Sequence, residues 1–414
     1  MKEEGGGGSR SGKSGGLGRN VLVLGLVSFF NDLSSEMAYP LLPLFLTETL
    51  GAGALFLGLV EGLADFIASF LQIFSGWFSD KLRRRKGLAL GGYTLSGAAR
   101  TCLAVAAAPW QALAAWFFNR VGKGVRTAPR DALIADSCSP QERGRSYGYH
   151  RAMDHLGALS GAAAASVMLA VSGAGYRTVF ALAAFPLALA LLLLWLGVRE
   201  RRETQEGGAA DGTCAAPTAP RAPLRLTLRP FDLRFRLFLA AVFLFTLGNS
   251  SDAFLLLRAR QAGGMDAAMI PALWGILHVV KSAANLRGGE LSDRLGRRRV
   301  IMAGWTVYAL TYLGFAVADR AAWFWPLFVV YGFYFMYESA GKAMVADLVP
   351  AELRGTAFGL YNFVVSLTLL PASLIMGLLW KVRGLNYAFV FGASTAAGAI
   401  ILLAVGSRVG KGSA

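Results

Sequence analysis

The feature that most restricts the fold of this chain is a series of apolar runs, each about 20 residues long or longer. A helix of that length crosses the roughly 30 Å hydrocarbon core of a bilayer. Only 16% of the 414 residues are charged, and 55% belong to the hydrophobic set. An ordinary soluble domain carries roughly 25% charged residues. The pattern therefore excludes a soluble enzyme, a disordered chain and a fibrous protein.

The apolar runs predict twelve membrane-spanning helices. A segment inside lipid has no water to satisfy its backbone groups, so each run must form a helix with internal hydrogen bonds. Two of the runs are polar for membrane helices, and hydropathy defines their limits least sharply. The predicted spans are residues 20–46, 54–79, 87–108, 110–137, 146–172, 176–198, 236–261, 266–292, 298–317, 322–348, 355–381 and 386–407.

The basic residues set the predicted orientation, because cytoplasmic connections of membrane proteins are enriched in Lys and Arg. Of the 41 Lys and Arg residues, 26 lie on the tails or beside the even-numbered connections, and only six lie on the opposite side. We therefore expect a multi-pass protein of the cytoplasmic (inner) membrane with both termini in the cytoplasm. The formal net charge of +16 then requires no nucleic acid as a partner.

One long polar stretch divides the chain. Residues 199–235 begin with a charged run and continue through Gly, Ala and Pro without an apolar period, which is typical of a linker. The predicted organisation is a disordered cytoplasmic tail at 1–19, a six-helix half at 20–198, a cytoplasmic linker at 199–235, a second six-helix half at 236–407 and a cytoplasmic tail at 408–414.

A match to a phosphate-binding loop and the three cysteines do not predict a bound nucleotide or metal. Residues 7–14 match GxxxxGK[ST]. A phosphate-binding loop needs a strand before it and a helix on a sheet after it, whereas here a Gly/Ser tail precedes a membrane span. The three cysteines are scattered and include no CxxC pair, so they predict neither a disulfide framework nor a thiolate metal site. We expect no cofactor.

The two halves of the chain repeat each other. GWFSDKLRRRK follows the second span and GELSDRLGRRR follows the eighth, which places Asp80 and Asp293 213 residues apart. Asp136 and Asp347 begin a second pair of similar segments, at an offset of 211. Ser-Ser-acid sequences end at Glu36 and at Asp252, 216 residues apart. These matches indicate a duplication, and repeated halves with a site between them are the architecture of many secondary transporters.

On these motifs the chain resembles the major facilitator superfamily. The superfamily's signature, GxxxDRxGRR between helices 2 and 3, matches 289–298 closely, while in the first copy Lys81 and Arg83 replace Arg and Gly. The resemblance covers roughly residues 20–407. It implies an all-α membrane protein with twelve transmembrane helices in two pseudo-symmetric six-helix bundles. It also implies that the conformational-switch residues are Gly76, Asp80, Arg84, Gly289, Asp293, Arg294 and Arg297.

A second similarity lies in the fourth span. Arg120, Gly122 and Gly124 look like the RxxxG motif of proton-coupled members, although Lys123 and Arg126 depart from the usual pattern. The fifth span lacks the Gly-Pro step that is typical of drug antiporters. The direction of transport and a drug substrate are therefore left open.

Ionisable residues fall on single faces of several predicted helices, at 100° per residue. A charge at mid-bilayer costs roughly 2.5–3.5 kcal/mol on insertion scales. Such residues either pair with each other to fix helix packing or line a water-filled cavity that binds a solute or a proton. The candidates are Asp32, Glu36, Glu61, Asp65, Arg120, Lys123, Arg126, Arg130, His150, Asp154, Asp252, His278, Lys281, Tyr334, Glu338 and Lys342.

Glu36 and Asp252 are the strongest candidates among the acids, because the repeat places them at equivalent positions. The alternative is that each Ser-Ser-acid caps a kink or pairs with a nearby Arg. Asp32 shares the face of Glu36 and could carry a proton. The basic arc of the fourth span would bind an anionic solute group or neutralise the acids of the first two spans. Glu338 and Lys342 have the spacing of an intrahelical ion pair.

We therefore expect a monomeric secondary transporter that moves a small charged or zwitterionic solute by alternating access, coupled to protons by symport or antiport. One alternative is a metal or metal-chelate permease that uses His150, Asp154, His155 and His278, although their spacing matches no known metal motif. Another is a non-transporting membrane sensor or scaffold. We find no HExxH, GxSxG or nucleotide-binding loop in a credible structural context, so we do not expect an enzyme.

Overall fold

The computed structural model describes residues 18–82, 85–138, 142–199, 228, 230–350 and 353–406. The GxxxxGK[ST] match at 7–14, most of the 199–235 linker, Arg84 and the 408–414 tail lie outside these residues. The helix that carries Gly76 and Asp80 is described, but the side chains there are not.

The first half of the chain forms six spans, three of which are assembled from more than one helical segment. The first span changes from an α-helix to shorter helical turns at Tyr39, just before Pro40, whose ring removes a backbone donor. The segments are α1 (Arg19–Ala38) with α2 (Leu42–Leu44), α3 (Ala54–Leu82), α4 (Arg85–Thr101) with the 3-10 turn Cys102–Val105, α5 (Pro109–Asp136), α6 (Arg143–Ser172), and α7 (Tyr176–Leu182) with α8 (Ala184–Gly197).

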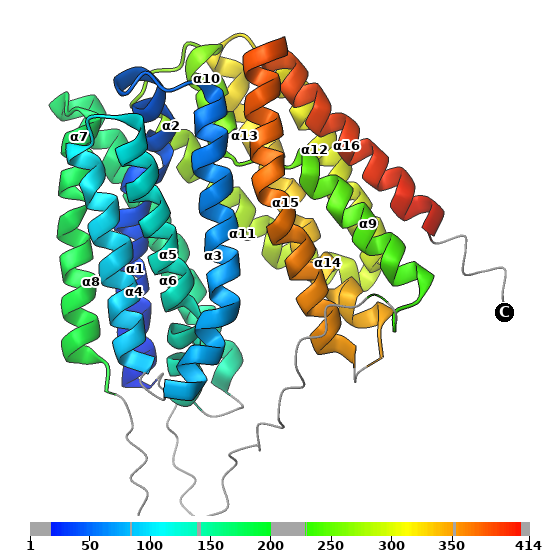
Figure 1. The fold of residues 1–414 in the computed structure, drawn as a ribbon, viewed down its shortest axis with the longest axis horizontal. Helices are drawn as coiled ribbons and strands as arrows, with labels where there is room; N and C mark the ends of the chain where they lie inside the picture. The colour runs from blue at the N-terminus through cyan, green and yellow to red at the C-terminus, as the bar shows by residue number, and fades with distance from the viewer. Residues whose placement is uncertain are drawn as a thin grey trace, which may run out of the picture.

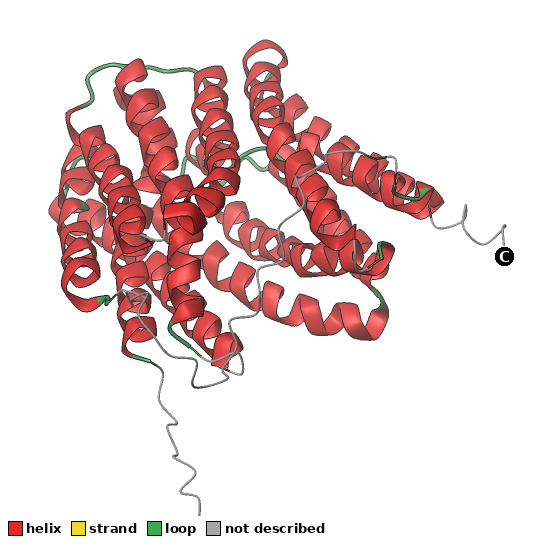
Figure 2. Cartoon of the chain, turned by 60° about the horizontal axis from the view of Figure 1, so that its bottom comes forward, coloured by secondary structure: helices red, strands yellow, loops and turns green. Residues whose placement is uncertain are grey.

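The second half also forms six spans, and two of them are interrupted near their middles. They are α9 (Leu233–Gly248) with α10 (Ala253–Gln261), α11 (Met269–Leu295), α12 (Arg297–Val317), α13 (Ala321–Gly332) with α14 (Met336–Leu348), α15 (Arg354–Arg383) and α16 (Leu385–Gly406). The prediction of twelve spans is confirmed, with ends within a few residues of those expected. The described residues are helices and short connections without a strand (Figure 2).

Nine of the described helices are both long and apolar enough to cross a membrane by themselves. The three remaining spans fall short for physical reasons that the sequence shows. The third, α4, has 17 residues, among them Arg100 near its end. The fourth, α5, carries several Arg and Lys residues, and the tenth, α13 with α14, contains several Trp and Tyr residues together with Glu338 and Lys342. These spans need their neighbours to be stable in lipid, which is expected of helices that surround a polar interior.

The first six spans and the last six spans form two groups of helices that lie side by side in Figure 1. We call the side where α1 begins and α16 ends the terminal side, and the other the distal side. The groups are close together on the distal side and spread apart toward the terminal side (Figures 1 and 2). The wedge between them is the arrangement that a rocking motion of two halves would produce.

A close approach of α3 and α15 joins the two groups on the distal side. A Cβ atom on Gly58 would collide with the backbone oxygen of Ser373, and one on Gly377 would lie 2.6 Å from the backbone oxygen of Ala54. Both glycines therefore let the two helices meet backbone to backbone, as small residues do in membrane helix pairs. Of the two predicted polar spans, α5 packs within the first group, whereas α11 packs against α6 of the other group.

Candidate functional site

The centre of the structure holds a buried carboxyl group at the contact between the two halves. Glu61 on α3 is 0% exposed. Its Oε2 accepts a hydrogen bond from the Ser251 hydroxyl at 2.8 Å and a longer one from the Tyr39 hydroxyl at 3.4 Å. Tyr39 and Ser251 are themselves 3.4 Å apart. Among the described residues, Oε1 of Glu61 has no hydrogen-bond partner. One carboxyl oxygen is therefore bound by both halves, while the other is free to hold a proton.

A second contact across the halves involves Glu36. Its Oε2 accepts a hydrogen bond from the indole nitrogen of Trp274 on α11 at 2.7 Å. Nε2 of His278, one turn further along α11, lies 3.9 Å from the same oxygen. The side chains of Glu36 and His278 keep 17% and 18% of their exposure. Glu36 therefore lies where both halves contact it, and it is not fully buried.

Arg120 on α5 lies beside these two contacts. Its Nη2 is 3.6 Å from Oδ1 of Asp65, which is a loose ion pair. Its guanidinium carbon is 5.1 Å from the ring centroid of Trp116 and 5.8 Å from that of Tyr39. The Asp65 side chain is 32% exposed, and that of Arg120 is 11% exposed. The ion pair is therefore not sealed from its surroundings.

The seventh span is unwound at Asn249–Asp252, between α9 and α10. Two hydrogen bonds satisfy freed backbone groups there: the Tyr308 hydroxyl donates to the Gly248 carbonyl at 2.7 Å, and the Ala253 amide donates to the Ser251 hydroxyl at 3.2 Å. Asp252 accepts a hydrogen bond from the Tyr331 hydroxyl at 2.6 Å. Broken helices near the midplane are where transporters of this architecture place their sites. The prediction of a continuous span over 236–261 was wrong at this point.

Glu36 and Asp252 occupy equivalent positions in the repeat but different surroundings. Glu36 lies in the last turn of α1 and contacts the other half, whereas Asp252 ends the unwound segment and bonds within its own half. The alternative prediction, that Ser-Ser-acid caps a kink, agrees with Asp252 and also with Glu36, because the first span changes helix type at Tyr39. The duplication therefore preserves the position of the acid without preserving its environment.

Asp154 on α6 forms a separate polar group inside the first half. It accepts a hydrogen bond from Ser28 of α1, and its other oxygen lies 3.5 Å from Nδ1 of His150 and 3.9 Å from Arg151. His150 is 2% exposed. Asp32 accepts a 2.8 Å hydrogen bond from its neighbour Asn31. The hydrogen bond from Ser28 joins α1 to α6, so Asp154 suits a packing role as well as a functional one.

The four basic residues of α5 do not converge on one point. Arg126 stacks over Tyr93 of α4, with its guanidinium carbon 4.3 Å from the ring centroid. Arg130 pairs with the adjacent Asp131 at 2.8 Å. Lys123 is exposed and lies within electrostatic reach of Asp32 and Asp65. Only Arg120 and Lys123 therefore remain as central cations, and a single anion site formed by the whole arc is not observed.

The candidates in the second half are mostly surrounded by aromatic rings. Nζ of Lys281 lies 3.8 Å from the ring centroid of Phe335, and the buried Tyr334 packs 4.7 Å from Tyr331. Lys342 is exposed, and Glu338 accepts a 3.4 Å hydrogen bond from Asn285. No ion pair joins Glu338 to Lys342 among the described residues. The predicted intrahelical pair was wrong because Glu338 turns toward α11.

The residues proposed as metal ligands do not gather into one set. His150 pairs with Asp154 in the first half, while His278 lies beside Glu36 at the contact between the halves. His155 is an electrostatic neighbour of His278. Within the part of the chain that the structure describes, no three His, Cys, Asp or Glu residues are placed to hold one metal ion. The geometry therefore gives no support to a metal permease.

The predicted switch residues of the second copy lie on the terminal side, where Asp293 is exposed and Gly289 and Arg297 are half-buried. Arg297 contacts the carboxylate of Asp293 and lies 3.3 Å from Asp347 at the end of α14. In the first half, Arg85 contacts Asp136 at the equivalent end of α5. Arg294 is exposed, and Gly289 has no neighbour within 4 Å of the Cβ it lacks. The repeat thus extends to a pair of ionic contacts, each within one half, and a switching role stays a prediction.

On the distal side, a cluster missed in the sequence joins the two halves. Arg260 at the end of α10 donates to Glu48 at 2.6 Å, and the Tyr176 hydroxyl donates to the other oxygen of Glu48 at 2.6 Å. Arg260 also donates to the Met265 carbonyl at 2.8 Å. We call Glu48, Tyr176 and Arg260 the distal clamp. Its only sequence signal was the presence of Arg260 among the few basic residues of that side.

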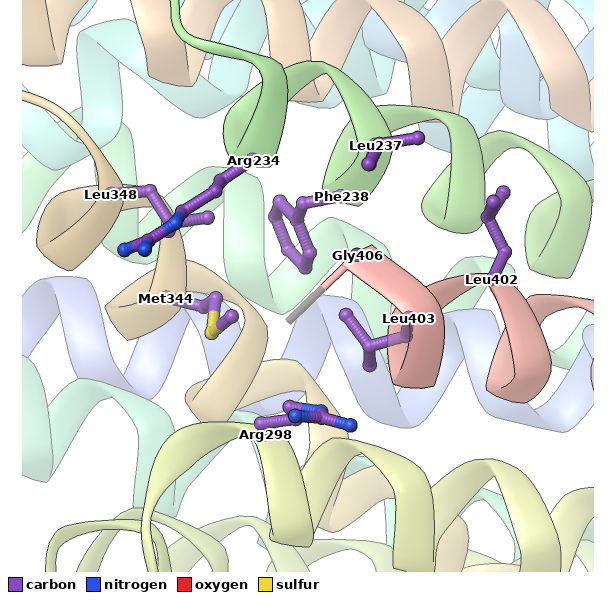
Figure 3. Close-up of a pocket in the computed structure, with 9 residues that line it drawn as sticks. All are labelled: Arg234, Leu237, Phe238, Arg298, Met344, Leu348, Leu402, Leu403 and Gly406. Carbon is purple, nitrogen blue, oxygen red and sulfur yellow. The ribbon is translucent and has the colours of Figure 1, made fainter. Parts of the chain in front are cut away.

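A pocket of about 230 Å³ lies at the terminal end of the second half, between α9, α12, α14 and α16 (Figure 3). Its lining is mostly apolar, with Arg234 and Arg298 as the charged residues, and includes none of the predicted site residues. The candidate site is therefore the set of central contacts between the halves and not this pocket.

Comparison with known proteins agrees with this architecture. The family profile described as Major Facilitator Superfamily matches residues 24–336 and 264–412. An uncharacterized MFS-type transporter of Methanocaldococcus jannaschii is 34% identical over 383 residues, which are 91% of this chain and 92% of that protein. The multidrug resistance protein MdtH of Edwardsiella ictaluri is 33% identical over 161 residues, 39% of this chain and 38% of that protein.

Among solved structures, a bacterial homolog of the human lysosomal transporter Spinster, in an inward-facing and unoccupied conformation, aligns with a TM-score of 0.71. The alignment covers 97% of this chain and 96% of that chain, at 15% sequence identity. At this identity the likeness shows the fold alone. The profile and the fold together indicate a multi-pass membrane transporter and not an enzyme.

Proposed function

Because the chain belongs to the major facilitator superfamily, we propose that it is a proton-coupled secondary transporter of a small charged or zwitterionic solute. The observation that carries the proposal is the position of Glu61. It is a fully buried carboxyl group that accepts hydrogen bonds from a hydroxyl of each half. A proton bound at this point changes the charge of a group that both halves contact.

The coupling follows from hydrogen-bond chemistry. The hydrogen bonds that Ser251 and Tyr39 donate to Oε2 stabilise the charged carboxylate more than the neutral acid, whose proton would lie on Oε1. Rocking the halves apart at this level would take Ser251 away and leave a buried charge with less compensation. The proton is therefore expected to bind more strongly in one conformation than in the other. That difference is what links proton movement to the conformational equilibrium.

Alternating access requires that contacts on the two sides form in turn. In this structure the distal clamp is closed, and Ser166 of α6 donates to the Ala268 carbonyl of the other half nearby. All the described hydrogen bonds between the halves lie at the centre or on the distal side. We propose that both termini are cytoplasmic in the inner membrane, so this conformation opens to the cytoplasm. We also propose that the monomer is the transporting unit.

The solute site is proposed to lie between Glu36, Asp65, Arg120 and Lys123. The Asp65 and Lys123 side chains are not fully buried. Glu36 accepts a hydrogen bond from the indole of Trp274 in the opposite half. Acids and bases are thus both available to a solute that enters from the terminal side. An ion in this position costs several kcal/mol unless water or a partner compensates it, which supports a hydrated passage.

The test is transport by the purified protein in liposomes under an imposed pH gradient, with a broad panel of labelled solutes. We expect a solute to accumulate against its gradient in the wild-type chain. Glu61→Gln should abolish this accumulation but retain solute exchange without a pH gradient, because the amide keeps the shape but not the proton. Loss of both activities, or of neither, contradicts the coupling role of Glu61.

A second set of variants tests the other acids. Glu36→Gln combined with Asp252→Asn should change solute affinity or coupling for at least one solute of the panel. If this double variant behaves as the wild type across the panel, the assignment of both acids to the site is wrong. If the wild-type chain moves no solute under any gradient, a sensor or scaffold role replaces the transporter.

A further inference from the structure

Three aromatic rings from the two halves form one continuous surface at the centre. Tyr39 stacks on Trp116, with ring centroids 6.0 Å apart and an interplanar angle of 28°. Its ring also lies 4.9 Å from that of Trp274, which comes from the second half. Trp116 and Trp274 are 1% and 7% exposed. We call these three rings the central aromatic surface. It exists only while the halves are in contact, because Trp274 lies on the other side of the interface.

A cation of the protein itself already occupies this surface. The Arg120 guanidinium lies over the Trp116 and Tyr39 rings, at 5.1 Å and 5.8 Å. A guanidinium within about 6 Å of a ring centroid is attracted by the negative face of the ring. Its ion pair with Asp65 is 3.6 Å long, and its Nε has no hydrogen-bond partner among the described residues. Arg120 is therefore held by charge and stacking and not by a two-pronged ion pair.

Carboxyl groups surround the rings on the first half. Glu36 accepts from the Trp274 indole, Glu61 accepts from the Tyr39 hydroxyl, and Asp65 faces Arg120. Lys123, one turn along α5, is the other nearby cation, and it is exposed. Aromatic faces and carboxylates placed together recognise positive charge.

We propose that the transported solute is an organic cation, an ammonium or guanidinium group attached to a planar or apolar body, and that Arg120 is its built-in competitor. This inference rests on the proposed function and names its substrate class. The solute displaces Arg120 from the central aromatic surface and takes its place opposite Asp65. Arg120 moves toward the hydrated passage. With no solute bound, Arg120 prevents the rings and acids from being left without a cation.

The binding test uses four probes of similar size on the purified chain in nanodiscs. Benzyltrimethylammonium and phenylguanidinium carry the proposed charge, whereas benzoate is an anion and benzyl alcohol is neutral. We expect the two cations to raise the midpoint of thermal unfolding by mass action and the other two to leave it unchanged. Stabilisation by benzoate without stabilisation by either cation overturns the proposal.

Variants then locate the bound cation. Trp116→Leu and Asp65→Asn should each weaken cation binding about tenfold, equivalent to about 1.4 kcal/mol. Trp195→Leu is the matched control, because Trp195 is 61% exposed on α8, away from the centre. If the control weakens binding as much as Trp116→Leu does, the cations bind elsewhere and the proposal is wrong.

The variant Arg120→Gln distinguishes a site that binds a cation from a site that binds an anion. If Arg120 is a built-in competitor, its removal should leave the affinity for the cation probes unchanged or higher than in the wild type. If Arg120 instead holds an anionic solute group, the same variant abolishes benzoate binding. Should Arg120→Gln fail to fold, the wild-type comparison of cations with benzoate still decides the question.

The two proposals fail in different ways. If the chain transports another class of solute and binds neither cation, the cation assignment is wrong and the transporter remains. If no solute crosses the membrane under any gradient, the proposed function itself is wrong, whatever the probes bind.

Discussion

The two halves share an outline but bury different chemistry. Among the described residues, the buried charged or titratable polar groups of the first half are Glu61, Arg100, Arg126 and His150, whereas the second half buries Arg258. The second half instead packs aromatic residues together, with Tyr308 4.1 Å from Tyr312 and 5.3 Å from Tyr334. The first half therefore supplies ions, and the second supplies hydroxyl groups, indoles and a broken helix.

This difference teaches which features of a repeat are structural and which are chemical. The ionic contacts Arg85–Asp136 and Arg297–Asp347 occur in both halves at equivalent helix ends, so they belong to the scaffold. Glu61 has no equivalent contact in the second half, and the residue that faces it is a serine of the unwound segment. A site between unlike halves can respond to their separation, because neither half completes it alone.

The largest effect expected from this comparison is a difference in pH-driven transport between a variant of Glu61 and a variant of Asp252. Glu61→Gln should reduce pH-driven transport to the level of empty liposomes, since it removes the proton-binding group at the interface. Asp252→Asn should reduce it only in part, because Asp252 bonds to Tyr331 within its own half. Transport assays of both variants at matched protein density decide the matter. Equal loss in the two variants would mean that the halves contribute equivalent acids.

A large effect on stability is expected at Arg258. Its guanidinium donates to the carbonyl oxygens of Phe315, Ala316 and Ala318, at 2.8 to 2.9 Å, and so caps the end of α12. Arg177 has the corresponding role in the first half but donates once, to Ala104 at 3.2 Å. Arg258→Met should destabilise the protein by about 3 kcal/mol and Arg177→Met by about 1 kcal/mol.

Thermal unfolding of both Arg variants in the same detergent measures this difference. The opposite ranking would show that burial of the arginine stem, rather than its carbonyl contacts, dominates.

A smaller effect is expected at two adjacent serines. Ser251→Ala removes the donor to Glu61 and should shift the pH dependence of transport, with a loss of about 1–2 kcal/mol in the stability of this conformation. Ser250→Ala is the matched control, because the Ser250 hydroxyl has no hydrogen-bond partner among the described residues. A shift of equal size in Ser250→Ala would indicate a general disturbance of the unwound segment.

The smallest effect is expected at the distal clamp. Glu48 and Arg260 keep 34% and 31% of their side-chain exposure, so the pair contributes about 1 kcal/mol or less. Glu48→Arg should increase the accessibility of distal-side cysteine probes by about fivefold or less, in line with that energy.

Glu48→Arg combined with Arg260→Glu should restore the wild-type accessibility. If the double reversal stays as open as the single variant, the clamp does not act through charge.

Much of the fold could be predicted because it depends on runs of apolar residues. The twelve spans, the division into two sets of six and the paired loop motifs all follow from hydropathy and spacing. The break at Asn249–Asp252 was missed, although Asn, two Ser and Asp in a row are residues that compete for backbone hydrogen bonds. The pairing of Glu338 was also mistaken, because helical spacing cannot show that Asn285 of another helix lies nearer.

For the candidate site, the sequence identified most of the ionisable residues but not their partners. It grouped Arg126 and Arg130 with Arg120, although α4 and Asp131 engage them instead. It ranked Glu36 and Asp252 above Glu61, because the repeat emphasises equivalent positions. Tyr39, Trp116 and Trp274 were not among the candidates, since aromatic residues in an apolar run carry no signal of their own.

The sequence by itself determined that the chain crosses a membrane many times and that its halves are duplicated, because lipid permits only helices with satisfied backbones. It also showed which charges lie inside the bilayer. Tertiary structure decided which of those charges meet, since a contact between α3 and the unwound segment Asn249–Asp252 depends on how two bundles pack and not on the spacing within either. Glu61, Ser251 and Trp274 became parts of one site only when the halves came together.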